Sequence, residues 1–420
     1  MPTPVQVSAF STKYKLLDPH GPVCLIIQAQ MRVAAGLDRF QPAGFPEVGH
    51  VIYDAPRSDG GSEKICIVDS PASMANHLEQ VCLAGENDHE LHPDLAKIPY
   101  LQCVTDRKPT INGGSVTLRS DDPHDRVITT SLTEGHRIAS DYFLDGLPTS
   151  RWVDEVRANI RKDNKEEEKV VPAHWEGDSF RDVLRKEFQI IEVKKDKTYF
   201  IPPEAWWSIY RTLFKYDPNS LIHGVLFAKE QIKISRILTA HLEAIGAARV
   251  GRSGVKFDRL GKTTSGQPIF AVDEETARKI RATFIIDLAL LRSYGRDVKQ
   301  GEEDKTVGLT GPQKEFLLAL ALWKMQQLLG RTFSYRSGCK LRMQNVSITT
   351  DEQKDGDGPL PTELPVIDIG SAITAAEFSA EPITRVYYPY DALFKTGEER
   401  PATSSEQQNE EELSEAESED

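Results

Sequence analysis

Apolar and polar residues alternate over residues 23–33, near the start of the chain. The apolar positions include Ile27, Ala29, Met31 and Val33, and between them stand Gln28, Gln30 and Arg32. A period of two predicts a β-strand with one buried face and one face in water. We expect the wet face of this strand to carry hydrogen-bonding and cationic groups.

Other short runs of β-forming residues predict further strands, some of them in hairpins. One hairpin is expected to join residues 48–53 to 64–68, and another to join residues 190–193 to 199–201. Single strands are expected at residues 101–104, 116–118, 221–228 and 341–348, and near Val366 and Val386.

Helices are predicted by apolar residues at helical spacing and by their capping residues. Ser70 and Pro71 begin one helix, and the capping-box pattern Ser131-Leu-Thr-Glu134 predicts another that continues through Tyr142. Further helices are expected at residues 178–188, 202–214, 237–245, 273–293 and 312–329. The chain is therefore mixed α and β, and it shows no internal repeat.

Two segments of unusual composition stand between or within these elements. Residues 151–169 are highly charged and are expected to form a solvated helix or an exposed insertion, and residues 295–308 are expected to be a linker. The predicted helix at 202–214 carries an aromatic stripe that we interpret as core rather than as a stacking platform, namely Trp206, Trp207, Tyr210 and Phe214.

A length of 420 residues suggests two to three domains or one heavily elaborated domain. No apolar run reaches the roughly 18 residues of a membrane span, and no signal segment is found, so we expect a cytoplasmic protein without membrane contact. The five cysteines are widely spaced and lack the Cys-x-x-Cys spacing of zinc and redox sites. We therefore expect free thiols, no metal and no other cofactor.

The net charge of −13 argues against a nucleic-acid partner, but the charge is unevenly distributed. Eight acids and no base stand in residues 401–420, which we expect to be a disordered acidic tail. Residues 229–262 carry eight bases against three acids, and residues 324–342 carry five bases and no acid. Because local potential attracts a phosphate chain, these two segments are candidates for binding one.

Bases alternate with glycines in the stretch Arg249-Val-Gly-Arg-Ser-Gly-Val-Lys256. Glycine lets a backbone approach phosphates closely, and its N–H groups can bind them. The stretch is not a Walker motif, because the spacing is missing and a helix, not a strand, is expected before it. The candidate phosphate contacts of the two basic segments are Arg249, Arg252, Lys256, Arg336, Lys340 and Arg342.

A rigid loop follows the first strand and reads Arg39-Phe-Gln-Pro-Ala-Gly-Phe-Pro46. A guanidinium beside an exposed ring suits a nucleic acid, because arginine binds phosphate oxygens in pairs and a ring stacks on any base. The alternative is an ordinary proline-rich turn with Phe40 packed into the core. Arg39, Phe40 and Gln41 are accordingly the first candidates for RNA contact.

Two histidines, His77 and His136, are the candidate acid–base groups. His77 has no histidine, cysteine or carboxylate at metal-ligand spacing, and a structural or merely polar role is favoured for it. Arg137 follows His136, but neighbouring residues on a helix point about 100° apart and cannot converge on one atom. Capping and packing are therefore the favoured roles, and the sequence shows no set of nucleophile, base and orienting residue.

Four parts of the chain resemble the Csb-one family, the backbone (Cas-seven type) subunits of the type I-G, formerly I-U, CRISPR surveillance complex. The resemblance extends over residues 20–395. Its motifs read Arg39-Phe-Gln-Pro-Ala-Gly-Phe-Pro46, Asp69-Ser-Pro-Ala-Ser-Met-Ala-Asn-His-Leu-Glu79, Thr130-Ser-Leu-Thr-Glu-Gly-His-Arg-Ile138, and Gly224-Val-Leu-Phe227 with Gly251-Arg-Ser-Gly-Val-Lys256.

The resemblance implies an α+β fold with an RRM-like, ferredoxin-type core, as in other RAMP-superfamily proteins. The expected organisation is one elaborated domain over residues 1–400, with a charged and helical insertion near 145–220. It also implies a filament of several copies on a CRISPR RNA (crRNA), pairing of target DNA with that guide, and contacts with other CRISPR-associated subunits. Backbone subunits are not generally nucleases, so no catalytic residue is expected.

Two other functions remain open at this point. One is an endoribonuclease of the RAMP type that processes CRISPR RNA with His77 or His136. The other is a metabolic enzyme that acts on a small anionic substrate.

Overall fold

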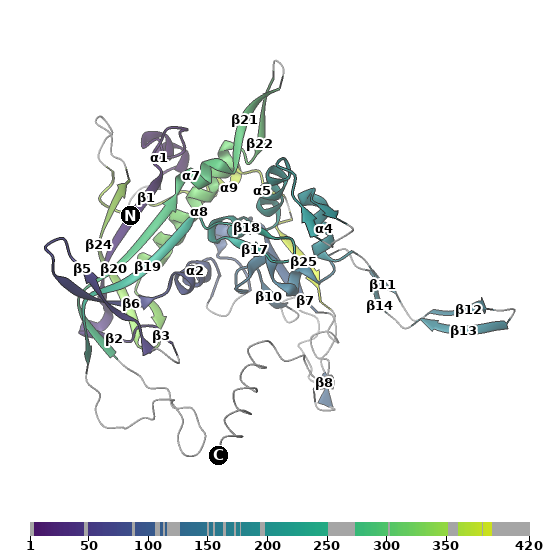
Figure 1. The fold of residues 1–420 in the computed structure, drawn as a ribbon, viewed down its shortest axis with the longest axis horizontal. Helices are drawn as coiled ribbons and strands as arrows, with labels where there is room; N and C mark the ends of the chain where they lie inside the picture. The colour runs from purple at the N-terminus through teal and green to yellow at the C-terminus, as the bar shows by residue number, and fades with distance from the viewer. Residues whose placement is uncertain are drawn as a thin grey trace.

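Figure 1 shows the fold in a computed structural model of the chain. The described residues are 4–45, 49–85, 89–105, 110–111, 114–115, 127–148, 151–153, 156–162, 165–171, 174–176, 178–193, 198–250, 274–300, 303–351, 360–379 and 381–388. The expected strand at 116–118 and the expected acidic tail at 401–420 lie outside them. The protein is mixed α+β, and among the named strand pairs only β7 with β25 is parallel.

The largest element is an eight-stranded antiparallel sheet, drawn on the left of Figure 1. Its strands lie in the order β23-β24-β1-β20-β19-β6-β5, and the short strand β2 pairs with β20 off this path. The bounds are β23 Phe333–Arg336, β24 Cys339–Thr350, β1 Cys24–Val33, β20 Glu274–Asp287, β19 Leu238–Val250, β6 Ser62–Asp69, β5 Ile52–Pro56 and β2 Arg39–Phe40.

The first expected strand is confirmed as β1, in the middle of the sheet. Leu25, Ile27, Ala29 and Met31 are at most 3% exposed, whereas the alternating Gln28 and Arg32 are exposed. β1 pairs with β20 on one side and with β24 on the other. Both edges of its backbone are therefore hydrogen-bonded, and only its second face meets water.

Two of the helix predictions are wrong. Residues 237–245 and most of residues 273–293 form β19 and β20, which pair from Leu238–Ile286 to Val250–Glu274. Burial in β20 alternates, since Ile280, Ala282 and Phe284 are buried while the residues between them are half-buried. Alanine, leucine and glutamate favour a helix locally, but pairing with strands far away in the sequence overrides that weak preference. Only α7 (Leu288–Ser293), capped by Asp287, is helical.

The helix expected at residues 312–329 is confirmed as α8 (Gly311–Leu329), with a capping box between Thr310 and Gln313. Twelve of its 19 residues are buried, so it is surrounded by protein on most sides. The helices α1, α2, α6, α7 and α9 contact it. α2 also contacts β19, which places helices on one face of the sheet. Their bounds are α1 Val7–Lys13, α2 Pro71–Gln80, α6 Pro218–His223 and α9 Ile369–Ala375.

Several other expectations are confirmed within a few residues. Ser70 caps α2, and Ser179 caps the helix expected at 178–188. The two hairpins, the helix expected at 202–214 and the strands near residues 101–104, 341–348 and 386 are present. The additional bounds are α4 Phe180–Phe188, α5 Ala205–Tyr216, β7 Tyr100–Val104, β15 Ile191–Val193, β16 Thr198–Phe200 and β25 Ile383–Tyr387. β7 is the middle strand of a separate sheet between β10 (Val127–Thr130) and β25.

Other expectations are corrected. The charged segment forms two hairpins, so the helix alternative is wrong. The β12–β13 hairpin extends away from the rest of the described chain, which agrees with the alternative of an exposed insertion (Figure 1). The expected linker at 295–308 is also a hairpin. The bounds are β11 Arg151–Val153, β12 Val156–Lys162, β13 Lys165–Val171, β14 His174–Glu176, β21 Gly295–Gln300 and β22 Glu303–Gly308. Alternating charged side chains are compatible with either structure, so the pattern did not distinguish them.

The capping-box pattern at Ser131 does not open a long helix. Residues 131–136 form turns, and two short helices follow, of which the second is capped by Ser140. Likewise, residues 221–228 divide between α6 and β17, and near Val366 there is only a bridge between Ile367 and Val5. The remaining bounds are η1 Ala34–Gly36, β3 Gly44–Phe45, β4 Gly49–His50, η2 Pro93–Leu95, β8 Thr110–Ile111, β9 Gly114–Ser115, η4 Arg137–Ala139, α3 Asp141–Leu144, β17 Val225–Phe227 and β18 Ile232–Ile234.

Candidate nucleic-acid interface

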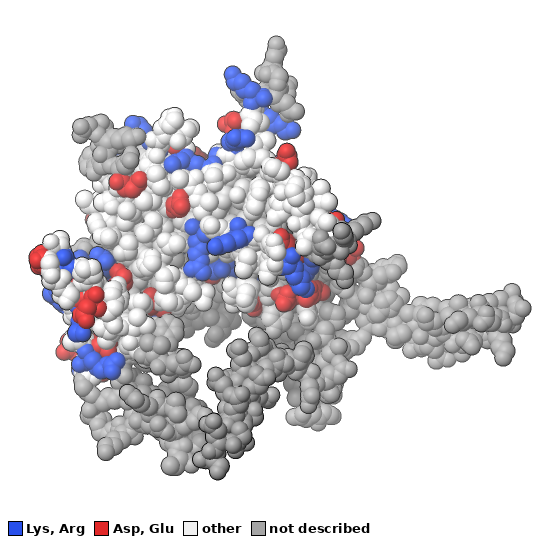
Figure 2. All heavy atoms as spheres, in the orientation of Figure 1, with Lys and Arg blue, Asp and Glu red and all other residues white. Residues whose placement is uncertain are grey.

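One end of the central sheet brings together most of the expected contacts. β1 and β19 end there, and β20 and β24 begin there, because neighbouring strands are antiparallel. Figure 2 shows basic and acidic side chains interspersed along this side of the molecule. We call this end of the sheet the cationic end, after its basic residues Arg32, Arg39, Arg249, Lys340 and Arg342.

The loop after β1 crosses the cationic end. Arg39 pairs with Thr276 and Phe40 with Glu275, at the start of β20. The Gln41 amide then donates to the Gly338 carbonyl in the turn between β23 and β24, at 2.9 Å. A Cβ on Gly338 would lie 2.7 Å from the Cβ of Gln41, so the half-buried Gln41 packs directly on that turn.

The expectation of an exposed ring at Phe40 is wrong. Its side chain is 1% exposed and belongs to the hydrophobic core. The neighbouring Arg39 is 45% exposed, because alternate residues of a strand point to opposite faces. The packing alternative therefore holds for Phe40, and its ring cannot stack on a base in this conformation.

Arg39 and Arg249 are exposed but have acidic partners. The Arg39 Nε lies 3.0 Å from a carboxylate oxygen of Glu274, and the Arg249 Nε lies 3.4 Å from the buried Glu275, which also contacts His50 at 3.1 Å. Exposed ion pairs contribute only about 0–1 kcal/mol. A phosphate can therefore displace Glu274 from Arg39 at small cost. Displacing Arg249 costs more, because it leaves the buried carboxylate of Glu275 without one of its partners, so Arg39 is the stronger candidate of the two.

Arg336 has a structural role. Its side chain is 23% exposed, and its Nη2 lies 2.9 Å from Asp69, whose other oxygen lies 2.9 Å from His77 Nε2. Burial by itself would raise the pKa of the Asp69 carboxyl, but the hydrogen bond with His77 and the charge of Arg336 outweigh burial and lower that pKa. Arg336 thus links β23 to the end of β6 and is a weaker candidate for RNA contact.

Lys340, Arg342 and Arg32 are the most available cations of the cationic end. All three are exposed, and none has an ion-pair partner within the described part of the chain. Arg32 and Arg342 lie directly opposite each other on β1 and β24. Like charges in opposite positions destabilise a sheet. An exposed pair of this kind, next to Lys340, is suited to bind a phosphate.

Arg32 was missing from the candidates, although the alternation of β1 had placed it on the wet face. Lys279 and Arg281 in β20 were missed for another reason, since that segment was expected to be a helix. Arg281 lies opposite Gln30 of β1 and has an ion pair with Glu243 at 3.0 Å. A search of wet strand faces for bases would have found Arg32 but neither of the other two.

Polar groups continue from the cationic end along the face of the sheet that points away from the helices. Gln28 of β1 lies between Thr283 of β20 and Ser347 of β24. Gln30 lies between Arg281 and Asn345. All of these side chains are exposed or half-buried. The face therefore offers hydrogen-bonding groups across three adjacent strands.

Arg252 and Lys256 lie outside the described residues. The chain that carries them leaves β19 at Val250 and returns to β20 at Glu274, two residues that pair with each other. Both ends of that segment therefore belong to the cationic end.

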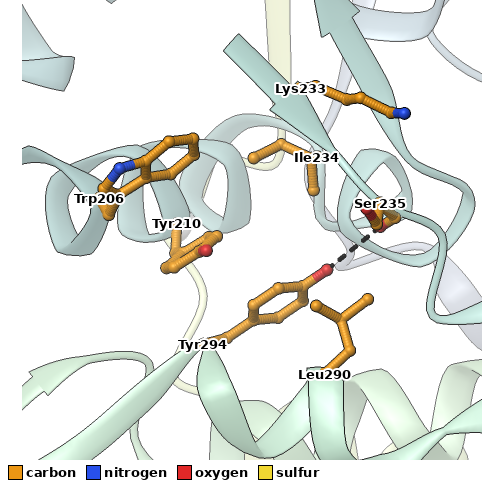
Figure 3. A pocket seen from close by; sticks show the side chains of 7 residues that line it. All are labelled: Trp206, Tyr210, Lys233, Ile234, Ser235, Leu290 and Tyr294. Carbon is orange, nitrogen blue, oxygen red and sulfur yellow. Dashed lines mark hydrogen bonds between the residues drawn. The ribbon is translucent and has the colours of Figure 1, made fainter. Parts of the chain in front are cut away.

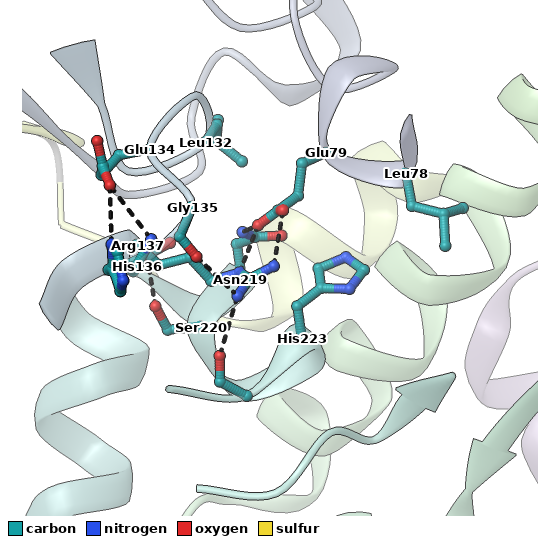
Figure 4. Close-up of polar contacts among 12 residues, drawn as sticks. Leu78, Glu79, Leu132, Glu134, Gly135, His136, Arg137, Asn219, Ser220 and His223 are labelled. Atoms are coloured by element: carbon teal, nitrogen blue, oxygen red, sulfur yellow. Dashed lines mark hydrogen bonds and ion pairs between the residues drawn. The ribbon is translucent and has the colours of Figure 1, made fainter. Parts of the chain in front are cut away.

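Three of the segments that carried the resemblance, residues 69–79, 130–138 and 224–227, meet in the interior. Arg137 forms two hydrogen bonds with Glu79 of α2, at 2.6 and 2.8 Å, and a third with the Gly224 carbonyl at 3.3 Å (Figure 4). Asn219 also donates to Glu79, at 2.6 Å. Arg137 has a φ of 55°, a conformation that costs energy for a residue with a side chain. The Arg137–Glu79 pair thus connects three segments far apart in the sequence.

The polar cluster extends to α8 through Lys324, which is fully buried. Its ammonium donates to Asn219 and lies 2.9 Å from His223 Nε2. Burial lowers the pKa of Lys324 and of His223, and it raises the pKa of the nearby Asp217 to about 7. These groups are buried away from the surface, so the cluster has a structural role.

The two candidate histidines lie in different settings. His77 is 14% exposed, contacts Asp69, and packs edge-on against Phe333 and Tyr335. Ser73 approaches the same His77 nitrogen as Asp69, at 3.4 Å, which differs from a catalytic triad, where serine and acid use opposite nitrogens. His136 is 83% exposed and lies 3.1 Å from Glu134. Packing accounts for Arg137, as expected, whereas His136 stands at the N-cap of η4 without a capping hydrogen bond from its side chain, so the capping role expected there is wrong.

In the described ranges, no group of three or more histidine, cysteine, aspartate or glutamate side chains is placed to hold a metal ion. All five cysteines are free thiols. None of the helices within those ranges is long and apolar enough to cross a membrane.

The fold and the cationic end define a class, a mixed α+β protein whose sheet presents arginine and lysine side chains suited to a phosphate backbone. Residues 25–249 match the model of a family described as CRISPR-associated protein GSU0053, and the chain belongs to this family. The match extends from β1 to Arg249 of β19. No curated protein matches the chain. The family gives the chain a role in CRISPR defence.

Proposed function

We propose that this chain is a non-catalytic backbone subunit of a CRISPR surveillance complex and that it binds guide RNA at the cationic end. The observation that carries the proposal is the exposed Arg32–Arg342 pair beside Lys340, because these cations face water without acidic partners in the described structure. Membership of a CRISPR-associated family supports an RNA ligand over other polyanions.

The proposal includes an RRM-like core. Four strands of the central sheet lie in the order β24-β1-β20-β19, and α2 and α8 follow β1 and β20 in the chain. The resulting sequence β1-α2-β19-β20-α8-β24 has the β-α-β-β-α-β order of a ferredoxin-type fold. The β5–β6 hairpin, α4, α5 and the projecting hairpins would then be insertions. The more specific assignment to the Cas-seven type and to type I-G rests on the resemblance of the sequence motifs to the Csb-one family, and the order of these elements is compatible with it.

RRM-like sheets often stack bases on aromatic residues of their open face. The central strands of this sheet instead present Gln28, Gln30, Thr283 and Arg281 on that face. Amide and guanidinium groups can bind phosphates and riboses, and such contacts carry no information about the base sequence. A subunit that repeats along a guide of variable sequence requires such binding, and base pairing with target DNA would supply the specificity.

The test is to purify the chain together with its neighbouring CRISPR gene products and a CRISPR array. We expect a high ratio of absorbance at 260 nm to that at 280 nm, and one RNA of uniform length on a denaturing gel. Several copies of this chain should be present per RNA. Protein free of RNA at low salt would contradict the proposal. Site-specific cutting of repeat RNA by the chain alone would contradict its non-catalytic part and favour the endoribonuclease.

A further inference from the structure

A pocket of about 300 Å³ opens at the opposite end of the central sheet from the cationic end. It lies between α5, β18 and the segment that follows β20 (Figure 3). Its lining residues are Trp206, Tyr210, Lys233, Ile234, Ser235, Leu290 and Tyr294. β20 has 14 residues, and a strand of that length extends over roughly 45 Å. The pocket and the cationic end are therefore two separate sites.

Three aromatic rings form its wall. The rings of Tyr210 and Tyr294 lie 4.6 Å apart with an interplanar angle of 33°, and Trp206 follows Tyr210 at 6.1 Å and 35°. In Figure 3 these rings line one side of the opening. Trp206 and Tyr210 are half-buried, so part of each ring remains accessible. Both rings also pack against the hydrophobic core, so the interpretation of the stripe as core holds for Trp206 and Tyr210, and the pocket leaves only part of each ring accessible.

One ring of the wall is held in place. Tyr294 is 1% exposed, and its hydroxyl donates to the carbonyls of Leu221 and Ser235 at 3.3 and 3.4 Å. Tyr210 lies against this fixed ring. A planar ligand would therefore meet a preorganised surface, which lowers the entropic cost of binding.

Residues 229–236 form one side of the pocket and carry three basic residues, of which Lys233 is in the lining. Lys233 of β18 lines the pocket and is exposed, while its neighbours Ile232 and Ile234 are buried. Lys229 is also exposed, and Arg236 is half-buried beside Gly224. Figure 2 shows basic side chains gathered in this part of the surface, near β17 and β18. The acid of this segment, Glu230, is buried and paired with Arg181 and Arg185, so it does not offset these bases.

We propose that this pocket binds a nucleotide, with the base stacked on Trp206 and Tyr210 and the phosphate at Lys233. Aromatic side chains stack on bases regardless of sequence, and arginine or lysine beside them binds the phosphate. The volume is at the lower end of the range for small-ligand sites, about 300–1,000 Å³, which suits one base rather than a dinucleotide cofactor. The ligand is either a free nucleotide or one base of a single strand.

The test uses the full-length chain and two probes, adenosine 5′-monophosphate and a six-residue oligoadenylate. Each is irradiated with ultraviolet light in complex with the protein, and the cross-linked peptide is identified by mass spectrometry. We expect a cross-link to the α5 peptide that contains Trp206 and Tyr210. A cross-link with the mononucleotide assigns a free nucleotide, and a cross-link with the oligonucleotide alone assigns a base within a chain. Absence of a cross-link to α5 with both probes overturns the proposal.

Affinity measurements on variants provide a second criterion. We expect Lys233→Glu and Tyr210→Leu each to lower the affinity for the probe that cross-links by about tenfold, since base stacking and a phosphate contact have comparable strength. Lys305→Glu, another exposed lysine outside the pocket, is the matched control and should bind normally. Equal affinity for Lys233→Glu and the control overturns the proposal. Lys233→Glu should retain guide RNA, so loss of the pocket ligand is distinguishable from failure of the backbone function.

Discussion

The electrostatic effect of Arg32 and of Arg342 depends on the residue that lies opposite each of them in the sheet. Each is an ordinary exposed arginine in its own strand, but the register places them side by side on β1 and β24. Their repulsion opposes folding unless an anion lies between them. We therefore propose a phosphate site at this pair, where the sequence by itself shows only two separate bases.

The first expected outcome concerns this pair. Arg32→Ala with Arg342→Ala should weaken guide-RNA binding at least about tenfold, because charge-assisted hydrogen bonds contribute about 1.5–3 kcal/mol each. The dependence of log affinity on log salt should become less steep by about 1.4, or 0.7 for each lost contact with a single strand. Titrations at several salt concentrations measure both quantities. Arg385→Ala, an exposed arginine of another sheet, is the control. An unchanged salt slope in the double variant would falsify the assignment.

The same substitutions, which should weaken RNA binding, should stabilise the RNA-free protein. Removing one of two opposed like charges should raise the free energy of unfolding of the RNA-free protein by about 0.2–1 kcal/mol. Urea unfolding of Arg32→Ala and Arg342→Ala measures this. A loss of stability instead would mean that the side chains contribute packing rather than repulsion.

The carboxyl group of Asp69 should make the stability of the fold depend on pH. Its pKa is lowered in the folded protein by His77 and Arg336, which outweigh burial. The carboxylate therefore stabilises the fold fully above its unfolded pKa of about 3.9, and this stabilisation is lost as pH falls through the lower folded value. In urea unfolding between pH 6 and pH 2.5, the wild type should lose more stability than Asp69→Asn. Parallel curves for the two proteins would contradict the role of Asp69.

At the scale of elements, the buried pair of Glu79 and Arg137 holds together parts of the chain that do not pair as strands. α2, η4 and the start of β17 meet there, and Asn219 extends the contact to α6. The family motifs at residues 69–79 and 130–138 contain both partners. The pairing of Glu79 with Arg137 therefore explains these two residues by packing. Packing does not explain the exposed basic residues at the cationic end, which are the candidates for ligand binding.

Breaking this pair should be costly. Glu79→Ala leaves the Arg137 guanidinium buried without its partner, and such losses cost about 3–5 kcal/mol. Thermal or urea unfolding of Glu79→Ala measures the effect. The control is His136→Ala, an exposed neighbour of Arg137, which should change stability by less than about 0.5 kcal/mol. Similar stabilities for both variants would show that the pair contributes little.

Elements were predictable where their signal is local. α8 combines a capping box with a long apolar pattern, and α2 and α4 begin at serine caps. β1 shows a clean alternation. β19 and β20 alternate as well, since Leu238, Ala240, Leu242 and Ala244 are separated by Thr239, His241 and Glu243. Several of these residues are also good helix formers, and the helix prediction that rested on them is wrong. Their strand conformation depends on pairing with each other and with β1.

At the scale of the whole molecule, the proposed function requires the chain to repeat along its ligand. The cationic end and the polar face across β20, β1 and β24 form one surface, so each copy would cover a fixed length of RNA. The projecting β12–β13 hairpin lies away from this body and is available to a neighbouring copy.

The corresponding measurement is native mass spectrometry of the chain with RNAs of increasing length. The number of bound copies should rise by one for each constant increment of nucleotides. A single copy at every length would indicate an isolated RNA-binding protein, and the backbone part of the proposal would then fail.

The sequence by itself determined the elements whose signals lie within a few residues, the wet face of β1 and the basic character of residues 229–262 and 324–342. It also contained the motifs of a CRISPR-associated family. Tertiary structure alone decided that β19 pairs with β20 and β20 with β1, that Phe40 is buried, that Arg336 is paired with Asp69, and that Arg32 faces Arg342. The physical reason is the same in each case, since burial and charge pairing depend on residues brought together by long-range strand register, which no local pattern encodes.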